Sequence, residues 1–516
     1  MKVALTLRDH IDRAVTVYPD RVALIDEPDQ PAESWGSLTW RQVYDRARAQ
    51  AAGLDALGLP VGARVAMVSH NSARLFSSFY GVSNWGRIFV PINFRLSADE
   101  VSYIVGHCGA DVLLIDPELE EHLASVDHPR KYLMGDASDA ELLRYDTEPR
   151  AWVPDEDATA TINYTSGTTA RPKGVEQTHR SLWVNAATFG WHAAITDRDT
   201  YLHTLPMFHC NGWGMPYATT AMGVPSVVLR KVDGPEILRR VDRHGVTLLC
   251  GAPAVVAAIL DAAATWEGPI PGAERVRMVV AGAPPPTRTI ERMETELGWE
   301  FIQIYGLTET APLLTMNRRR SEWDKLTPTE RAQKLGRAGA PALGVRLGVT
   351  GDGEIIARSN VVLKSYWDQP EATAEAVRDA GDGLDYFHTG DGGVIDDEGY
   401  VTISDRKKDV IISGGENVSS IEVEDALFSH PAVAEVAVIG VPDEKWGETV
   451  KALVVLAAGE SIDERGLIDY CRSKLAHYKC PTSVEFRDEL ARTATGKLQK
   501  FVLRAPYWEG RDKLVN

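Results

Sequence analysis

The sequence predicts an α/β protein with a large N-terminal domain of β-sheets wrapped by helices and a small α+β C-terminal domain. A chain of 516 residues, 44% hydrophobic and 25% charged, is long enough to bury at least two cores. Residues 1–407 alternate strand-like and helix-like patterns joined by Gly- and Pro-rich loops, as α/β domains do. Residues 408–516 form a unit of about a hundred residues, near the modal domain size.

The C-terminal domain is predicted from strand-like runs and one helix signal. The runs are VII (410–412), VAEVAVIGV (433–441) and VKALVVL (450–456). Ser419 precedes Glu422 by three residues, which is the spacing of a capping box at the start of a helix. We therefore expect a helix at residues 420–429, and we expect the preceding SGGEN segment (413–417) to be a loop that ends on it.

Charge and hydropathy exclude two classes of partner. The formal net charge of −18 argues against a nucleic-acid partner, because a surface that binds a phosphate backbone needs a concentrated basic face. The most apolar segment, residues 246–260, contains Gly and Pro and is shorter than a bilayer span. The start of the chain is charged too early for a secretory signal. We expect no membrane segment.

The cysteines predict a reducing compartment. None of the five belongs to a CxxC pair, and no His or carboxylate stands at metal-ligand spacing around them. We expect reduced thiols in a cytoplasmic protein. They are Cys108, Cys210, Cys250, Cys471 and Cys480.

A phosphate-binding loop is predicted at residues 164–174, which read YTSGTTARPKG. The preceding ATATINY (158–164) is rich in β-branched residues and predicts a strand. The Gly-containing run after it can turn successive backbone N–H groups toward one anion, and Lys173 adds a positive charge. The hydroxyl donors are Thr165, Ser166, Thr168 and Thr169.

This loop is not a Walker loop. The pattern GxxxxGK[ST] is absent, because Gly167 and Gly174 have the wrong spacing and Lys173 precedes the second glycine. A flexible polar linker is the competing interpretation of a Ser/Thr/Gly run. Other motifs have to decide between the two.

Three further segments, and a fourth between the last two of them, decide between a phosphate-binding loop and a flexible linker. The segments are IQIYGLTET (302–310), FHTGDGG (387–393) and TGKLQK (495–500), with SDRKKDVIISGGENVSSIEVE (404–424) between the last two. Together with YTSGTTARPKG, and in this order, they resemble the signature set of the adenylate-forming (AMP-binding) acyl-CoA synthetase superfamily. PMFHCNGWG (206–214) and the 413–424 segment are closest to its medium-chain fatty and aromatic acyl-CoA ligase branch.

The resemblance implies a nucleotide site and the adenylate-forming ligase fold. Glu300–Tyr305 is expected to be a buried strand that delivers Tyr305 for stacking on adenine. Asp391, expected after a turn, would bind the ribose hydroxyls with Arg406 near it. The implied nucleotide-binding residues are Thr165, Ser166, Gly167, Thr168, Thr169, Lys173, Gly282, Ala283, Pro284, Gln303, Tyr305, Gly306, Asp391 and Arg406.

The resemblance also implies the catalytic residues. Thr308 would donate to the α-phosphate, and Glu309, with Thr165, would hold Mg²⁺, which takes carboxylate oxygen together with nucleotide phosphates. Lys497 would reach from the C-terminal domain to bridge the substrate carboxylate and the α-phosphate. His209 would separate the nucleotide and acyl compartments.

The resemblance also implies two half-reactions, adenylation of the acid and then transfer of the acyl group to a thiol. A rotation of the C-terminal domain would separate them. Lys408 matches the hinge, Gly414 and Gly415 would line a narrow tunnel for pantetheine, and Trp446 matches a position that packs on coenzyme A. The acyl pocket is implied to contain His209, Trp213, Gly282 and Leu307. Its apolar lining predicts a medium-chain or aryl/aryl-propenoic acid.

ATP, Mg²⁺, coenzyme A and a small carboxylic acid are therefore the expected cofactor and substrates, and a homodimer is compatible with the family. One departure weakens the assignment of the acceptor. Cys480 and Thr482 stand where relatives often place basic residues that meet the phosphates of coenzyme A, so that only Lys479 remains. A carrier protein, another nucleophile, or an unusual oxyacid such as nitrite stays open. An ATPase that forms ADP and a non-catalytic nucleotide sensor are the alternatives of a different class.

Overall fold

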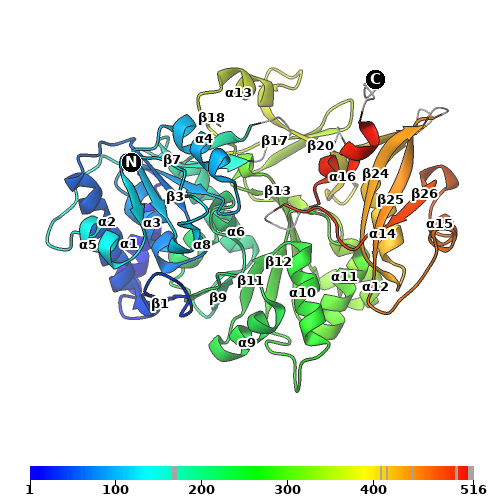
Figure 1. Cartoon of the computed structure of the whole chain (residues 1–516), viewed down its shortest axis with the longest axis horizontal. Coiled ribbons are helices and arrows are strands. Elements are labelled where there is room, and N and C mark those ends of the chain that lie inside the picture. The colour runs from blue at the N-terminus through cyan, green and yellow to red at the C-terminus, as the bar shows by residue number, and fades with distance from the viewer. Residues whose placement is uncertain (166–170, 407–408, 414–415, 444–445, 494–497, 510–516) are drawn as a thin grey trace.

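The computed structural model describes residues 1–165, 171–406, 409–413, 416–443, 446–493 and 498–509. Within these ranges the strands form four sheets. Figure 1 shows β24, β25 and β26 grouped with α14 and α15 at one end of the molecule, away from the end that holds the N-terminus. A large N-terminal domain of helix-wrapped sheets thus precedes a small α+β domain.

Among the described residues, the largest sheet has nine strands. Its central strands run parallel, and β2, β14 and β15 are antiparallel additions at its edges. The central strands read as short apolar runs because both faces are covered by other elements. In spatial order the strands are β15 (Ala340–Pro341), β14 (Leu313–Arg318), β13 (Glu300–Gly306), β12 (Arg277–Val280), β11 (Leu248–Gly251), β9 (Tyr201–His203), β10 (Ser226–Val228), β1 (Val22–Ile25) and β2 (Ser37–Thr39).

The second sheet has seven strands in the described ranges, and its strands β3 to β6 are parallel neighbours. The strand β7 joins β4 in parallel and then turns back as a hairpin with β8. In spatial order the strands are β18 (Ser365–Tyr366), β8 (Lys173–Thr178), β7 (Thr159–Thr165), β4 (Ile88–Ile92), β3 (Arg64–Val68), β5 (Val112–Ile115) and β6 (Lys131–Leu133).

Two five-stranded sheets complete the strands of the described chain. The third sheet is antiparallel and contains β16 (Arg346–Val349), β17 (Glu354–Arg358), β20 (Asp385–Ile395), β19 (Val377–Asp379) and β21 (Val401–Arg406). The C-terminal sheet contains β23 (Glu416–Val418), β22 (Ile411–Ser413), β25 (Gly447–Leu456), β24 (Val433–Asp443) and β26 (Ser483–Phe486).

Helices cover these sheets. The longer ones begin at side-chain caps: Thr39 caps α2, Ser97 caps α4 and Thr178 caps α6, which satisfies N–H groups that a helix start leaves unpaired. The helices are α1 (Arg8–Val17), α2 (Trp40–Ala56), α3 (Ala73–Ser83), α4 (Ala98–Cys108), α5 (Asp136–Leu142), α6 (His179–His192), α7 (Cys210–Trp213), α8 (Met215–Ala221), α9 (Gly234–His244), α10 (Pro253–Ala263), α11 (Thr287–Arg292), α12 (Pro328–Leu335), α13 (Pro370–Ala376), α14 (Ser420–Phe428), α15 (Glu464–Arg472) and α16 (Lys500–Trp508). Short turns are η1 (Pro117–Leu119), η2 (Met293–Leu297), η3 (Thr308–Thr310), η4 (Ser321–Lys325) and η5 (His477–Lys479).

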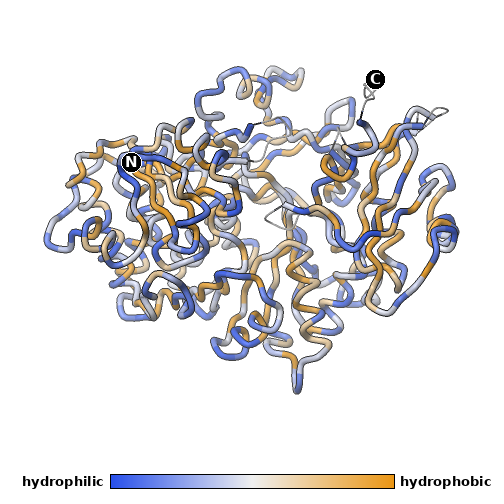
Figure 2. Tube along the Cα trace, in the orientation of Figure 1, coloured by the Kyte–Doolittle hydropathy of each residue, from blue (hydrophilic) through white to orange (hydrophobic). Residues whose placement is uncertain are grey.

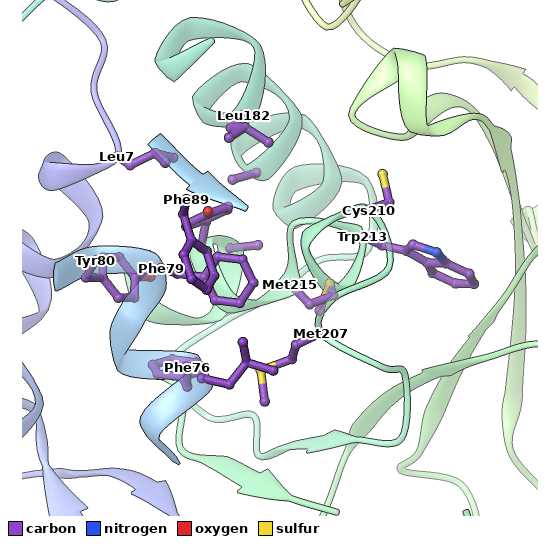
Figure 3. Packing of buried hydrophobic residues seen from close by; sticks show 14 of the residues in the cluster. Leu7, Phe76, Phe79, Tyr80, Phe89, Leu182, Met207, Cys210, Trp213 and Met215 are labelled. Carbon is purple, nitrogen blue, oxygen red and sulfur yellow. The ribbon is translucent and has the colours of Figure 1, made fainter. Parts of the chain in front are cut away.

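The main core lies between the two large sheets and their helices. Figure 2 shows apolar residues concentrated on the central strands and polar ones on peripheral loops. Figure 3 shows the rings of Phe79 and Phe89 gathered near Tyr80, all buried, while the indole of Trp213 points away from them. The C-terminal sheet has its own core on α14 and α15, so the chain buries more than one core, as its length predicts.

Most strands expected in the C-terminal domain are confirmed. Residues 433–441 lie in β24, residues 450–456 in β25, and residues 410–412 overlap β22. The expectation that SGGEN is a loop is wrong for its end, because β23 pairs back on β22 in an antiparallel hairpin. The turn expected before Asp391 is also wrong: this residue lies inside β20, where Gly390 adopts a φ of 72° and bends the strand without ending it.

The helix expected at residues 420–429 is confirmed as α14, and the Ser419 side chain accepts a hydrogen bond from the Glu422 backbone N–H at 3.4 Å. The reciprocal bond of the predicted capping box, from the Ser419 backbone N–H to the Glu422 side chain, does not form. The Glu422 carboxylate instead accepts from Lys479 Nζ at 2.7 Å. The ion pair with a lysine outside the helix takes the place of the reciprocal cap.

In the described part of the chain, no helix has both the length and the apolar character needed to cross a membrane. The apolar segment at 246–260 is divided between β11 and the start of α10.

All five cysteines are free and buried. Burial raises the pKa of the Cys108, Cys250 and Cys471 thiols to about 12 in each case, and it also raises the pKa of Cys210 and Cys480. Since the thiolate is the reactive form, these thiols should be inert at neutral pH.

We expect the native protein to show no thiol that reacts with Ellman's reagent within minutes at pH 7.5, and five after unfolding in guanidinium chloride. Absorbance of the released thionitrobenzoate measures both values. Fast release of one equivalent from the native protein would contradict the burial of these side chains.

Candidate active site

The predicted phosphate loop begins and ends on a hairpin. Thr165 ends β7 and lies directly opposite Lys173, the first residue of β8. The Lys173 ammonium lies 4.9 Å from the centre of the Tyr366 ring, so a cation–aromatic contact helps to orient it. The loop residues Ser166, Gly167, Thr168 and Thr169 lie outside the described residues.

The segments expected to bind adenine lie side by side because β12 and β13 are parallel neighbours. Gly282, Ala283 and Pro284 follow the end of β12, and Tyr305 lies near the end of β13. Gly282 has a φ of 94° and would have open space around a Cβ atom, so the backbone conformation rather than crowding favours glycine. The strand expected to deliver Tyr305 is thereby confirmed as β13.

Tyr305, Asp391 and Arg406 meet although they are distant in sequence. The Tyr305 hydroxyl donates to Asp391 Oδ2 at 2.8 Å, and Arg406 Nε lies 3.5 Å from Asp391 Oδ1. Antiparallel pairing of β20 with β21 places Asp391 opposite Arg406. The Asp391 carboxylate is buried. The geometry thus brings together the three residues expected around adenine and ribose.

Gln303 and Gly306 occupy the same strand. Gln303 is buried, and its Oε1 atom has no hydrogen-bond partner among the described residues, so a ligand N–H has an acceptor available there. A Cβ atom on Gly306 would lie 1.6 Å from the Pro312 carbonyl oxygen. Only glycine allows the chain to turn back so closely at the end of β13.

Thr308 and Glu309 form the turn η3 after β13. The Tyr366 hydroxyl donates to Glu309 Oε1 at 2.9 Å, and the Leu363 N–H donates to the Glu309 carbonyl at 2.7 Å. The Gln177 side-chain amide donates to the Thr308 carbonyl. Side chain and backbone of this turn are therefore held by residues of β8 and of the 363–366 segment.

The electrostatics of Glu309 suit a cation ligand. Burial raises the pKa of this carboxyl, against the hydrogen bond from Tyr366 and the positive charges of Arg406 and Lys173, which lower it. The raised pKa shows that the hydroxyl and the two cations do not fully offset the free-energy cost of ionising this buried carboxyl. A bound metal cation would lower that cost further.

The segment from His209 to Gly214 turns the wrong way for an α-helix. His209 is half-buried, and φ is 48° at Cys210, 52° at Asn211 and 58° at Trp213. The segment α7 is therefore a left-handed turn, which costs about 1–2 kcal/mol for each residue other than glycine. The Trp213 side chain is buried with 4% of its surface exposed. Leu307 is half-buried and packs against the same core.

Of the residues expected at the coenzyme A end, the structure describes Trp446. It is 48% exposed, and its backbone N–H donates to Asp443 Oδ1 at 2.9 Å. Lys408, Gly414, Gly415 and Lys497 lie outside the described residues. Lys479, the remaining basic residue of the 478–486 segment, is paired with Glu422, and Cys480 is buried.

Sequence reasoning missed several residues of this site. Tyr366 and Leu363 lie in a segment without a recognised motif, and only the fold brings them to Glu309. Asn163 lies two residues before Thr165 and reaches the acyl side of the site. An amide side chain inside a strand of mainly β-branched residues was the one available signal.

Comparisons with known proteins agree with this geometry. A family model described as AMP-binding enzyme matches residues 11–367, and one described as AMP-binding enzyme C-terminal domain matches residues 422–497. The chain belongs to the AMP-binding enzyme family, that is, to the adenylate-forming acyl-CoA synthetase superfamily, and it is an AMP-forming acid–thiol ligase. ATP and coenzyme A follow as its co-substrates. The resemblance and the fold class drawn from the sequence are confirmed.

Two curated relatives align over nearly the whole chain. The 2-methylpropanoate–CoA ligase CCL4 of Humulus lupulus is 35% identical, over 97% of this chain and 94% of the relative. The 4-hydroxybutyrate–CoA ligase 2 of Metallosphaera sedula is 36% identical, over 96% and 93%. Among solved structures, ATP-bound MatB from Rhodopseudomonas palustris superposes with a TM-score of 0.83 at 28% identity, covering 97% of this chain and 99% of that one. An anthranilate CoA ligase in complex with anthranoyl-AMP gives 0.86 at 26%, covering 98% of each.

The raised pKa of Glu309 leads to a prediction with a defined sign. A carboxyl with a raised folded-state pKa keeps its proton to higher pH than usual, and its ionised form destabilises the free protein as pH rises. Glu309→Gln should therefore melt at the same or a higher temperature than wild type at pH 8. It should release pyrophosphate at least about a hundredfold more slowly, because it lacks the charge.

Tyr366→Phe is the matched variant. Without the hydroxyl that favours the ionised carboxylate, the pKa of Glu309 should rise further, so the acidic limb of pyrophosphate release should move to higher pH. An acidic limb at the same pH in wild type and Tyr366→Phe would exclude Glu309 as the titrating group.

Proposed function

We propose that this chain joins an apolar carboxylic acid to coenzyme A in two steps at the site around Tyr305, Glu309 and Asp391. In the first step a carboxylate oxygen bonds to the α-phosphorus of ATP and the bond to pyrophosphate breaks. In the second step the coenzyme A sulfur bonds to the acyl carbon and AMP leaves. The meeting of Tyr305, Asp391 and Arg406 is the observation that carries this proposal.

The nucleotide would be held by residues from three sheets. The aromatic face of Tyr305 and the backbone of Gly282–Pro284 would cover the adenine, with the free Gln303 Oε1 as an acceptor. Asp391 would accept from the ribose hydroxyls. Thr165, the loop residues 166–169 and Lys173 would bind the phosphates at the hairpin mouth.

Mg²⁺ fits the donor set. The buried Glu309 carboxylate, with the hydroxyl of Thr165, offers hard oxygen ligands, and Mg²⁺ commonly takes one or two carboxylates plus nucleotide phosphates. When bound, Mg²⁺ screens the negative charge of the triphosphate. Thr308 would donate to the α-phosphate, and Lys497 would orient the substrate carboxylate against it.

The acceptor half-reaction requires a change in position. We propose that residues 408–516 rotate as one body about Lys408, which withdraws Lys497 and brings Gly414, Gly415 and Trp446 to the acyl adenylate. Some contacts that join α14 to the large domain lie at the surface, where Asp425 and Thr287 meet by hydrogen bonds of 2.9 and 3.3 Å, and solvent can replace such bonds at little cost. The rotation also has to break the two buried hydrogen bonds that Ser420 donates to Asp405, at 2.6 and 2.9 Å.

The acid is proposed to be a medium-chain or aryl acid, because Trp213, Leu307 and the backbone of Gly282 would line its pocket together with His209. A short aliphatic acid is the second candidate, favoured by the four-carbon acids in the names of the two curated relatives. Coenzyme A is the proposed acceptor in preference to a carrier protein.

One experiment tests the reaction and the acid together. Purified protein is given ATP, Mg²⁺ and acids from acetate and 2-methylpropanoate through decanoate to benzoate and cinnamate, with coenzyme A or phosphopantetheine as the thiol. Mass spectrometry should show AMP, pyrophosphate and the matching acyl-CoA. ADP and phosphate, or ATP binding without any product, would overturn the proposal.

Lys497→Ala separates the two half-reactions. It should slow adenylation about 10²–10³-fold, the usual cost of one preorganised charged donor, and still convert a supplied acyl adenylate to acyl-CoA. Its melting temperature should match that of wild type. Normal adenylation by the folded variant would remove Lys497 from the mechanism.

A further inference from the structure

The left-handed turn at residues 210–214 has five successive residues with positive φ. The values are 48° for Cys210, 52° for Asn211, 59° for Gly212, 58° for Trp213 and 77° for Gly214. Residues other than glycine rarely hold such a conformation in succession, so the surrounding structure must fix it. A strained turn of this kind needs identifiable restraints.

A closed set of buried hydrogen bonds holds the start of the turn. Asn211 Nδ2 donates to Thr161 Oγ1 at 2.9 Å, and Asn211 Oδ1 accepts from Asn163 Nδ2 at 3.1 Å. Thr161 Oγ1 donates to Asn163 Oδ1 at 3.1 Å. Asn163 Nδ2 also lies 3.3 Å from the Phe208 carbonyl, to which it donates. All three polar side chains are at most 2% exposed.

Asn185 of α6 holds the end of the turn. Its Nδ2 donates to the Trp213 carbonyl at 3.3 Å, while its Oδ1 accepts from the Leu313 N–H at 3.1 Å. Asn185 is fully buried. The Trp213 backbone is thus joined through one amide to β14, the strand that follows the Thr308–Thr310 turn.

These bonds connect the acid side of the site with its nucleotide side. Thr161 and Asn163 belong to β7, the strand that ends at Thr165. A Cβ atom on Gly214 would lie 3.9 Å from the Ala311 carbonyl oxygen, one residue after the Thr308–Thr310 turn. The left-handed turn therefore lies against the segment that carries the residues proposed to bind phosphate and Mg²⁺.

We propose that Asn163, Asn211 and Asn185 are positioning residues for acid specificity. They hold the Cys210–Gly214 turn in its left-handed conformation and so fix the indole of Trp213 as a wall of the acyl pocket at a set position relative to the nucleotide. This inference rests on the proposed function, because it presumes that an acid binds beside Trp213. It assigns the shape of the pocket to buried amides that touch no substrate.

A general contribution to stability is the competing role, and the two roles predict different measurements. Loss of stability alone lowers the melting temperature and the fraction of active enzyme, and it changes the rates for all acids by one factor. Loss of the fixed position of the Trp213 indole changes the ranking of the acids by kcat/KM. It also raises the KM for the acid while the KM for ATP stays within about twofold.

The test compares single variants, and one double variant, with wild type. Asn211→Gly removes the amide but keeps a residue that tolerates positive φ, so it should fold even where Asn211→Ala does not. Asn163→Ala removes the partner of the same bond. Trp213→Ala defines the ranking of acids without the indole. Gln50→Ala is the matched control, because this buried amide on α2 donates to Ser78 Oγ at 2.9 Å, away from the turn.

We expect Asn211→Gly and Asn163→Ala to shift the ranking of kcat/KM across the acid series toward that of Trp213→Ala. Discrimination between acids that differ by one methylene, about 10–200-fold in a fitted pocket, should fall by roughly tenfold. The Asn163→Ala/Asn211→Gly double variant should change the ranking by less than the sum of the two single variants, since both remove the bond between these two side chains. Gln50→Ala should keep the wild-type ranking.

A readout besides activity follows the indole directly. In protein labelled with 5-fluorotryptophan, the ¹⁹F resonance of Trp213 is the one lost in Trp213→Phe. It should shift or broaden in Asn211→Gly and stay in place in Gln50→Ala.

The inference is overturned if both asparagine variants keep the wild-type ranking of acids and the wild-type ¹⁹F resonance. It is also overturned if Gln50→Ala changes the ranking of acids as much as they do, or if Trp213→Ala leaves the ranking unchanged. If wild type itself forms no AMP with any acid, the proposed function fails and this inference with it. Normal turnover with an unaltered ranking overturns the inference alone.

Discussion

Buried side-chain amides join the two large sheets where their strands end, and the site depends on this junction. Asn71, just after β3, donates to the carbonyls of His203, Leu205 and Leu229 at 3.0, 3.0 and 3.2 Å, and its Oδ1 accepts from Met207 N–H at 2.8 Å. Strand ends leave polar groups that cannot join a ladder, and an amide satisfies them in the core at both its donor and its acceptor. The same solution recurs at Asn163 and Asn185.

A local arrangement of charges explains how a chain of net charge −18 can bind a polyanion. Lys173 and Arg406 stand near the buried Glu309 carboxylate, and Arg406 also lies 3.5 Å from the buried Asp391 carboxylate. A positive charge in a low-dielectric setting acts strongly at short range. Local arrangement and not net charge therefore decides what this site accepts, although net charge correctly argues against an extended basic surface.

The parts of the fold set by local sequence were predictable, and those set by distant contacts were not. The apolar run of β13 and the Ser419 cap of α14 follow from nearest neighbours, and both are confirmed. The hairpin return of β8 and the pairing of β23 depend on partners across the chain. Tyr366 could not be assigned to Glu309, because nothing near it in the sequence indicates that contact. The left-handed turn at Cys210–Gly214 contradicts local propensity, since its stability comes from β7 and α6.

The two steps of the reaction place opposite demands on the protein, and the structure separates those demands between its parts. Within the large domain, the buried side chains of Asn163, Asn185 and Asn211 are hydrogen-bonded at donor and acceptor, which favours one arrangement of acid and nucleotide. Between the domains, Arg288 and His430 meet by a bond of 3.3 Å at a partly exposed position, and Thr287 and Asp425 meet in solvent. Solvent replaces such surface bonds at little cost. The buried Asp405 carboxylate, however, accepts two hydrogen bonds from Ser420 of α14, so the proposed rotation of the C-terminal domain has to break this buried pair as well as the surface contacts.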